Sequence, residues 1–393
     1  MIARIFIPIL LIIVLTDLHV DYHFFRKKYR HQGWKRLLWG LPGIGMVAYT
    51  IALASIKSFA PEDITWLNVY LFLLGAYVIP KFLFVACSTA GMIWQRLRHT
   101  DTNYGNAAGA VLAVLCFVIL VYGTTLGFHK LNVRHVDLYF PDLPEAFDGY
   151  KLVHFSDAHV GAFDGWRMRY LKRDVDSINA QHADAVVFTG DLQNMRPHEI
   201  APCADVLRRI KAKDGVYTIL GNHDYADYAK VDTPTQRVYE AQTRQAERKL
   251  GWQLLLNEHR TLHRGSDSLV IAGEENDGLP PFPSKANLRQ TLAGVSAGSF
   301  VVMLQHDPTA WHRHILPGSQ AQLTLSGHTH NAQFSLLKWS PSSLIYKESY
   351  GLYLHGSRAL YVTSGIGGFV PFRFGASAEI AVITLHKQKT TQQ

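Results

Sequence analysis

Acidic, imidazole and amide side chains recur in five short motifs between Asp157 and His330. In chain order the motifs are Asp-x-His, Gly-Asp, Gly-Asn-His-Asp, Gln-His-Asp and Gly-His-Thr-His. Side chains i and i+2 of an extended chain point the same way, so the Asp-x-His and His-x-His triplets can each offer two ligands to one place. Carboxylate, imidazole and amide ligands without a thiolate suit divalent ions such as Mn, Fe, Zn or Mg. We therefore expect a divalent-metal site.

Strands and helices must bring these motifs together. Short apolar runs that predict strands precede all five motifs, at 151–155, 185–189, 216–220, 300–304 and 322–325. Helical patterns lie between them, at about 165–181, 198–212 and 234–250. This alternation predicts an α/β domain with functional residues on loops at the carboxyl ends of strands. One such motif alone is typical of a turn or a capping pair, but five in this order, each after a strand, favour a metal site.

The series of motifs resembles the calcineurin-like metallophosphoesterase superfamily. The resemblance covers about residues 130–388 and implies an α/β fold of two facing β-sheets flanked by helices, a four-layer α/β/β/α sandwich. It implies a first metal held by Asp157, His159, Asp191 and His330. It implies a second metal held by Asp191, Asn222, His306 and His328, with Asp191 bridging the two ions. His223 matches the family's catalytic histidine, which Asp224 is expected to orient.

Two longer segments narrow the resemblance. "LPEAFDGYKLVHFSDAHVG" at 143–161 and "YVTSGIGGFVPFRFGASAEIAVITL" at 361–385 are similar to the branch that contains YkuE- and YaeI-type phosphodiesterases. Members of that branch are commonly attached to membranes. Asn194 departs from the pattern, since relatives often have aspartate three residues after the Gly-Asp motif. This position lies outside the principal ligand set, so the prediction of activity stands.

Other polar and aromatic residues of this half leave alternatives open. The segment 273–285, rich in proline and acid, is either part of a substrate entrance or a surface excursion. The aromatic residues Phe369, Phe372 and Phe374 either pack a C-terminal strand, the favoured interpretation, or contact lipid or substrate. We expect structural or solvent-facing roles for the histidines without a partner motif, namely His154, His182, His198, His259, His263, His312, His314 and His355.

The first 128 residues contain four apolar segments, at about 2–25, 37–56, 66–94 and 107–128. A membrane-spanning helix needs about 20 mostly apolar residues, which the second and fourth segments clearly provide. The first is weaker, because its apolar run Ile5–Leu15 is followed by Asp17, His19 and Asp21. No small-residue cleavage site follows that run, so a retained helix is favoured over a signal peptide. The pattern predicts a multi-pass transmembrane region over 1–128.

Loop charges predict the orientation of these helices. Six basic residues crowd into the loop after the first segment: Arg26, Lys27, Lys28, Arg30, Lys35 and Arg36. Arg96 and Arg98 follow the third segment, whereas the loop Lys57–Thr65 has one lysine against two acidic residues. Positively charged loops stay in the cytoplasm. We therefore expect a plasma (inner) membrane protein whose catalytic domain is extracytoplasmic.

An ionisable residue, Lys81, lies near the middle of the third segment, directly after Pro80. One interpretation is an intramembrane ion pair with Asp17 and Asp21, which share a helix face. The other is a helix broken at Pro80, with the lysine extending to an interface. The sequence does not decide between them.

Composition excludes some other functions. The formal net charge is +8, but no basic stripe is interleaved with aromatic residues, so no nucleic-acid partner is expected. The three cysteines, Cys87, Cys116 and Cys203, form no Cys-x-x-Cys pair, which excludes a thiolate zinc site.

The chain is thus predicted to be a membrane-anchored phosphoesterase with two divalent cations. Metal-activated hydroxide would hydrolyse phosphodiesters in preference to monoesters, with lipid-linked or cell-envelope phosphoesters as candidate substrates and the lipid bilayer as a partner. The alternative is a non-catalytic membrane protein whose metal domain binds a phosphorylated ligand or partner.

Overall fold

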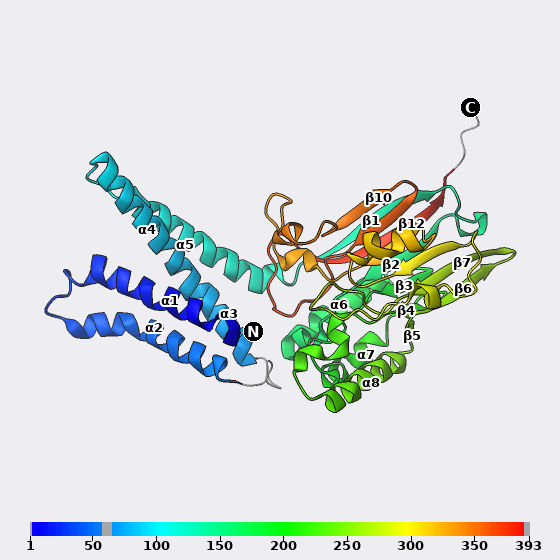
Figure 1. Ribbon diagram of the computed structural model, residues 1–393, viewed down its shortest axis with the longest axis horizontal. Helices are drawn as coiled ribbons and strands as arrows, with labels where there is room; N and C mark the ends of the chain where they lie inside the picture. The colour runs from blue at the N-terminus through cyan, green and yellow to red at the C-terminus, as the bar shows by residue number, and fades with distance from the viewer. Residues whose placement is uncertain (1, 57–64, 389–393) are drawn as a thin grey trace. The chain divides into compact units, whose positions relative to one another are not determined.

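The computed structural model describes residues 2–56 and 65–388 and divides into two compact units, Met1–Thr124 and Thr125–Gln393 (Figure 1). The first unit is helical and the second contains the β-sheets. Each is described by itself below.

Helices α1 (Ile2–Val20), α2 (Gly33–Ala54), α3 (Thr65–Leu73), α4 (Ile79–Arg98) and α5 (Tyr104–Tyr122) form the first unit. Short π-helical turns continue α1, join α3 to α4 and extend α5, at Asp21–Phe25, Leu74–Val78 and Gly123–Gly127. Four resulting stretches are long and apolar enough to cross a membrane: Ile5–Phe25, Gly33–Ala54, Thr65–Arg98 and Tyr104–Gly127. The predicted all-α region of about four candidate transmembrane helices is therefore confirmed. Most of the predicted loop Lys57–Thr65, residues 57–64, lies outside the described residues.

Two ion pairs link charged residues of these helices. The Nζ of Lys81 donates a hydrogen bond to Asp17 Oδ1, and only 7% of the lysine side chain is exposed. Asp21 pairs instead with Arg36, whose Nε and Nη2 lie 2.8 and 2.6 Å from its two carboxylate oxygens. The helix continues through Pro80, because the π-helical turn before α4 accommodates the proline. The ion-pair interpretation of Lys81 is correct for Asp17, and the broken-helix alternative is wrong.

Two mixed six-stranded sheets make up the second unit. The order in the first sheet is β1 (Leu131–Phe140), β12 (Ala378–Lys387), β2 (Tyr150–Phe155), β3 (Ala185–Phe188), β4 (Val216–Thr218) and β5 (Gln253–Leu254). The order in the second is β10 (Gly351–His355), β11 (Arg358–Val362), β9 (Leu323–Ser326), β8 (Phe300–Leu304), β7 (Asp267–Gly273) and β6 (Glu258–Arg264). Strands β2, β3, β4 and β5 are mutually parallel, as are β7, β8, β9 and β11.

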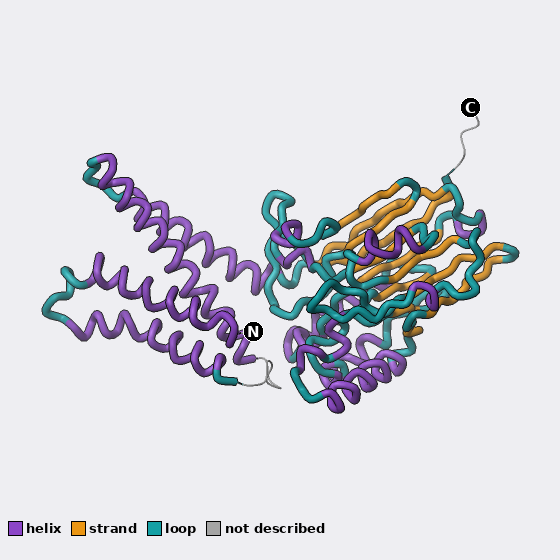
Figure 2. Tube along the Cα trace, in the orientation of Figure 1, coloured by secondary structure: helices purple, strands orange, loops and turns teal. Residues whose placement is uncertain are grey.

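Alternating side chains of these strands build three apolar cores, which define four layers. Leu152 on β2 and Ile271 on β7 face the core between the sheets. Their neighbour Val153 packs with residues of α6 (Met168–Asn179) and α7 (Ala204–Leu207), and Val270 packs with the π-helical turn Trp311–Ile315. Each sheet therefore has one face on the other sheet and one face under helices, as Figure 2 shows. The predicted four-layer α/β/β/α sandwich is confirmed.

The predicted elements of this half match the structure with one exception. All five predicted strands are present, as β2, β3, β4, β8 and β9, and the predicted helix at 234–250 is α8 (Thr233–Lys249). The predicted helix at 198–212 contains only the single turn α7, preceded by 3-10 turns. Pro202 lies within that segment, and a proline has no N–H for an α-helical hydrogen bond.

Candidate metal centre

The five predicted ligand loops follow the carboxyl ends of β2, β3, β4, β8 and β9. Five of the predicted ligands on these loops have left-handed backbones, a conformation that non-glycine residues rarely adopt. Their φ angles lie between 43° and 71°, at Asp157, His159, Asp191, His328 and His330. The Asp-x-His and His-x-His triplets are therefore not extended, contrary to the expectation from sequence. Their side chains converge because each loop turns. Such strain is typical of functional sites, where the surrounding fold maintains it.

Two glycines allow the loops to approach one another closely. A Cβ at Gly221 would lie 2.2 Å from Asp191 Oδ1, and a Cβ at Gly327 would lie 2.2 Å from Asp157 Oδ2. Neither distance is compatible with a side chain. These glycines therefore let two backbone turns pack directly against the two carboxylates.

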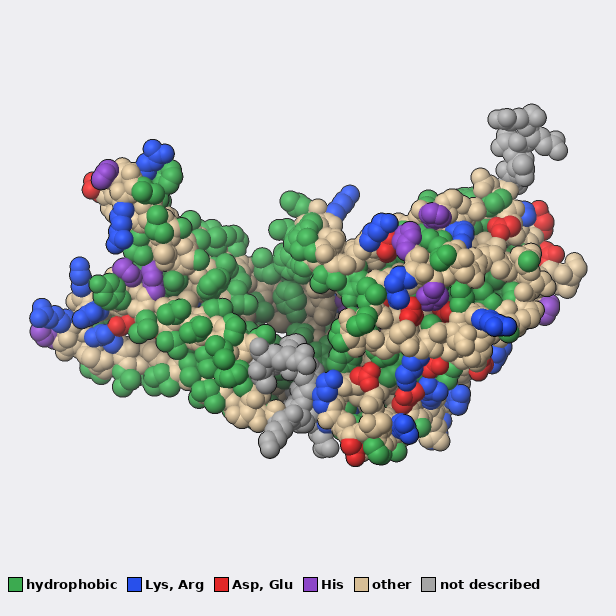
Figure 3. Space-filling model, in the orientation of Figure 1, with side chains coloured by type: hydrophobic (Ala, Val, Ile, Leu, Met, Phe, Trp, Pro, Cys, Tyr) green, Lys and Arg blue, Asp and Glu red, His purple; other side chains and the backbone are tan. Residues whose placement is uncertain are grey.

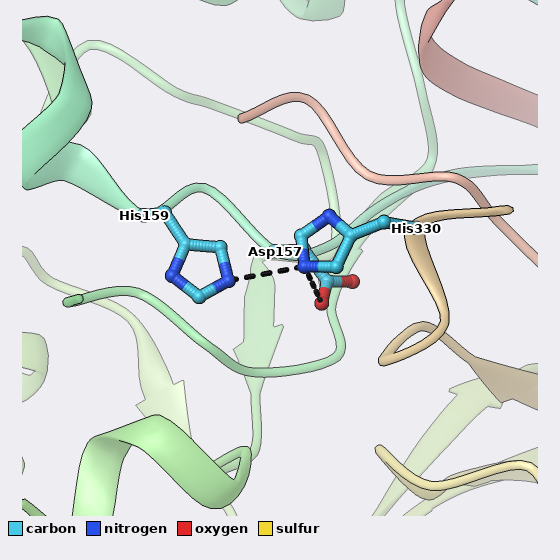
Figure 4. Close-up of side chains that lie close together, drawn as sticks. All are labelled: Asp157, His159 and His330. Carbon is cyan, nitrogen blue, oxygen red and sulfur yellow. Dashed lines mark hydrogen bonds and ion pairs between the residues drawn. The ribbon is translucent and has the colours of Figure 1, made fainter. Parts of the chain in front are cut away.

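Asp157, His159 and His330 form one cluster of ligand atoms (Figure 4). His330 Nε2 lies 3.2 Å from His159 Nε2 and 3.3 Å from Asp157 Oδ1. Asp157 and His159 are completely buried. Three atoms with lone pairs thus face the same point.

Asp191 lies between this cluster and a second one. Its Oδ2 is 3.6 Å from His159 Nε2 and 3.2 Å from His306 Nε2. His306 Nε2 is in turn 3.1 Å from Asn222 Oδ1, which also lies 2.7 Å from His328 Nδ1. One carboxylate oxygen is therefore shared by histidines of both clusters, which is the arrangement expected of a bridging ligand.

Hydrogen bonds to other groups orient two of these imidazole rings. His306 Nδ1 lies 2.6 Å from the Thr189 carbonyl, which accepts its proton and turns Nε2 toward the cluster. His328 Nε2 lies 2.9 Å from the Tyr346 hydroxyl, which leaves Nδ1 facing Asn222. Such contacts fix the tautomer of a ligating histidine. Sequence reasoning missed Tyr346, because no motif surrounds it.

Electrostatics of the site are set by burial. It raises the pKa of Asp157 to about 6 and lowers the pKa of His159 to about 3 and of His328 to about 4. Burial also lowers the pKa of His306, but the charges of Asp191 and Asp157 raise it to about 10. The imidazoles of His159 and His328 are thus neutral beside carboxylates, whereas His306 keeps a proton that a divalent cation would displace, and the residues present fit divalent cations.

His223 lies beside both clusters. One of its ring nitrogens is within 4.8 Å of ligand atoms of His159 and Asp191. Its Nδ1 lies 2.5 Å from the Asn194 carbonyl, and its ring stacks on Tyr228 at a centroid distance of 4.2 Å. The backbone of Asn194, the position that departs from the family pattern, therefore orients this ring.

Asp224 has a different contact from the expected one. Its Oδ2 accepts hydrogen bonds from the backbone N–H groups of Gly221 and Asp191, and its Oδ1 from those of Leu192 and Gln193. Three of these bonds join the Gly-Asp loop to the Gly-Asn-His-Asp loop, and the fourth, from Gly221, closes the latter loop on itself. The Asn194 carbonyl, rather than Asp224, binds the ring of His223. Asp224 therefore positions the backbone of Asp191.

Two further predicted segments reach the site. Phe282, within 273–285, meets the ring of His328 edge-on at 4.8 Å, which favours the entrance interpretation of that segment. Phe369 lies 6.2 Å from the ring of His223, whereas Phe374 stacks on Phe334. The buried guanidinium of Arg373 donates to the carbonyls of Ser364, Gly365, Gly367, Ala376 and Ser377, which fixes the loop that carries these aromatic residues.

Comparison with known proteins gives matches over both halves. A family described as "Probable Calcineurin-like phosphoesterase, transmembrane domain" matches residues 3–128, and one described as "Calcineurin-like phosphoesterase" matches residues 150–332. The uncharacterized metallophosphoesterase YkuE of Bacillus subtilis is 31% identical over 274 residues, which are 67% of this chain and 88% of that protein.

Two further relatives have different names. A transmembrane protein with metallophosphoesterase domain from Danio rerio is 28% identical over 335 residues, 81% of this chain and 74% of that one. The UDP-2,3-diacylglucosamine pyrophosphatase LpxG of Chlamydia muridarum is 25% identical over 315 residues, 67% of this chain and 92% of that one.

Proposed function

Because the chain belongs to the calcineurin-like phosphoesterase family and is a multi-pass membrane protein, we propose that it is a membrane-anchored phosphoesterase with two divalent cations. The observation that supports two cations best is the position of Asp191. Its Oδ2 lies 3.6 Å from a histidine of the first cluster and 3.2 Å from a histidine of the second. A single ion would not need one carboxylate oxygen to face histidines of both clusters.

The proposed ligands are those that the motifs predicted. The first ion would be held by Asp157, His159, Asp191 and His330, and the second by Asp191, Asn222, His306 and His328. When bound, two divalent cations lower the pKa of water to near neutrality and polarise a phosphoryl oxygen. The protein contributes a rigid arrangement of ligands, since the left-handed loops, Asp224 and the tight glycine contacts hold the donors in place.

His223 is the proposed general acid. The Asn194 carbonyl accepts the Nδ1 proton, so the Nε2 atom is the one available to interact with the substrate. Protonated at both ring nitrogens and lying beside both clusters, His223 would donate its Nε2 proton to the leaving oxygen as the phosphoester bond breaks. Tyr228 stacks on the ring and limits its rotation.

Substrate and orientation complete the proposal. We propose phosphodiesters of lipid head groups or cell-envelope polymers in preference to monoesters. The printed name of the chlamydial relative, a diacylglucosamine pyrophosphatase, supports a substrate with acyl chains. The basic loops at 26–36 and 96–98 support an extracytoplasmic catalytic domain at the plasma membrane.

Hydrolysis of bis-(p-nitrophenyl) phosphate and of p-nitrophenyl phosphate tests the proposal directly. The full chain in detergent should cleave the diester faster than the monoester with Mn²⁺ and neither ester with a chelator. No hydrolysis of either ester by protein with full metal occupancy would favour the alternative, a domain that binds a phosphorylated ligand without turnover.

A further inference from the structure

The loop between His330 and strand β10 exposes large apolar side chains. Within residues 336–345, hereafter the apolar loop, Leu337 is 94% exposed, Ile345 78% and Leu344 76%, and Leu336 and Trp339 are about half exposed. Figure 3 shows hydrophobic side chains gathered where this segment, orange in Figure 1, projects from the second unit. Isolated exposed leucines are ordinary, but a contiguous exposed apolar patch marks an interaction site.

Burial in the apolar loop is inverted relative to a water-facing loop. Two of its three serines are inside, with Ser340 3% and Ser342 6% exposed, and the exposed Ser343 donates its Oγ hydrogen to the Ser340 carbonyl at 2.7 Å. Ser340 Oγ donates to the Asn331 carbonyl at 2.7 Å and lies 2.9 Å from Ser342 Oγ. The polar groups are thus satisfied internally while the apolar groups point outward. This pattern suits a surface that faces lipid rather than water.

The backbone conformation at the tip of the apolar loop also favours a surface that faces lipid. Leu336 and Trp339 pair across a tight turn, in which Leu337 and Lys338 have φ angles of 50° and 70°. Turns with two positive φ angles strongly favour Asn-Gly or Asp-Gly. A leucine here is strained and almost fully exposed, so turn formation does not explain it. Contact of its side chain with an apolar environment does.

We propose that the apolar loop inserts into the lipid bilayer. Its composition matches the membrane interface: Trp339 and leucines lie beside Lys338 and Lys347, and no acidic residue occurs from 334 to 347. A bilayer is always available, because the chain is a multi-pass membrane protein. Along the chain, only residues 128–130 separate the last helical turn from β1.

Insertion would bring the metal centre to the lipid headgroup layer. The Tyr346 hydroxyl, directly after the apolar loop, contacts the proposed ligand His328 at 2.9 Å. Asn331, directly after the proposed ligand His330, holds Ser340 through its carbonyl. The loop that would enter the bilayer is thus joined at two points to the Gly-His-Thr-His loop, which carries two of the proposed ligands, and would present headgroup phosphates to the ions. This second part rests on the proposed function; insertion itself does not.

Contact quenching by brominated lipid tests insertion in the full chain. Leu337→Cys and Ile345→Cys would be labelled with the fluorophore NBD in a background in which Cys87, Cys116 and Cys203 are replaced by alanine. Val238→Cys, at an exposed apolar position on α8, is the matched control. The proteins would be reconstituted into nanodiscs of phosphatidylcholine and phosphatidylglycerol, with or without brominated acyl chains.

Labels at 337 and 345 should be quenched about threefold or more over the label at 238, because an interfacial segment lies about 5–10 Å below the surface. In a Leu344→Cys reporter, adding Leu337→Asp and Ile345→Asp should reduce quenching to the control level. Equal quenching at 337, 345 and 238 would overturn the proposal. Self-quenching that rises with protein density, without quenching by bromine, would also overturn it and indicate a second copy.

Cleavage of bis-(p-nitrophenyl) phosphate by the same labelled proteins separates the two proposals. Loss of cleavage with quenching intact would contradict the proposed phosphoesterase but leave insertion standing. Intact cleavage without quenching would contradict insertion but leave the proposed phosphoesterase standing.

Discussion

The two halves of the molecule both bury charged side chains, but they compensate them differently. In the helical half, Asp17 binds Lys81 and Asp21 binds Arg36, so each acid has a basic partner. In the sandwich half, among the residues that the structure describes, the ion pairs of Asp157 and Asp191 are with histidines alone. The histidines are themselves potential ligands.

This difference distinguishes a structural charge pair from a ligand site. An acid paired with lysine or arginine is neutral as a unit and stabilises the packing of its elements. Acids that face only imidazole nitrogens are paired with groups that can themselves bind metal, so a divalent cation can take the place of the imidazole proton. We therefore expect metal-dependent behaviour from one cluster and purely structural behaviour from the other.

Removing Asp191 should have the largest effect. Asp191→Ala deletes the oxygen shared by both clusters, so we expect loss of bound metal and at least about a thousandfold lower turnover. Metal content by mass spectrometry and hydrolysis of bis-(p-nitrophenyl) phosphate measure both. Asp176→Ala, which breaks a surface pair with Arg209, is the control and should change neither. Full metal occupancy in Asp191→Ala would exclude Asp191 as the bridging ligand.

Unpairing the helical cluster should lower stability and leave chemistry unchanged. Lys81→Met leaves Asp17 buried without its partner, which costs about 3 kcal/mol. The thermal unfolding midpoint in nanodiscs should fall, while turnover per folded molecule stays the same. Asp17→Leu combined with Lys81→Met removes both charges and should restore most of the lost stability. A loss of turnover in the double variant would show that this pair takes part in the chemistry.

The difference between the charge pairs of the helical half and the ligand site of the sandwich half was only partly predictable from sequence. The ligand types followed from five motifs, because parallel strands end at the same edge of a sheet and bring their loops together. The geometry did not follow: Asp157 and His159 were expected on an extended chain, but the structure has left-handed turns there. Tertiary contacts, such as the four N–H groups bound to Asp224, determine those φ angles, and no local pattern encodes them.

Contacts distant in sequence were the other unpredictable part. Lys81 and Asp17 are 64 positions apart, and the sequence allowed the lysine either a partner or an interface. Tyr346 contacts His328, and the Asn194 carbonyl contacts His223, through side chains and backbone atoms that no motif marks. The exposure of Leu337 was equally hidden, since an apolar run normally predicts burial.

Removing His223 should affect chemistry without affecting metal binding. His223→Ala should retain its metal content and lose at least about tenfold in turnover, because a proton donor to the leaving oxygen is lost. The loss should be smaller for a diester whose leaving group is a weaker base, since that leaving oxygen needs less protonation. Unchanged turnover with full metal occupancy would remove His223 from the mechanism.

A third charged cluster lies in the sandwich half and should behave like the helical pairs. His314 Nε2 lies 2.8 Å from Glu274 and its Nδ1 lies 3.0 Å from Asp277. Burial lowers the pKa of His314, but hydrogen bonds to Asp277 and Glu274 raise it to about 9 from an ordinary value of 6.5. The imidazolium is thus paired with acids and has a structural role.

The effect of His314 on stability should depend on pH and be the smallest of the four predicted effects. A raised pKa in the folded state gives stabilisation that is complete below pH 6.5 and is lost as the pH rises through about 9. Allowing for solvent screening, we expect the free energy of unfolding to fall by about 1 kcal/mol over this range. His314→Gln should be less stable at pH 6 and should lack this decline, as thermal unfolding at a series of pH values would measure. Because His314 is paired with Glu274 and Asp277 and is not a proposed ligand, its removal should leave the metal content unchanged. A drop in bound metal in His314→Gln would instead show that this cluster supports the metal centre. It would then contradict the distinction between structural charge pairs and ligand sites.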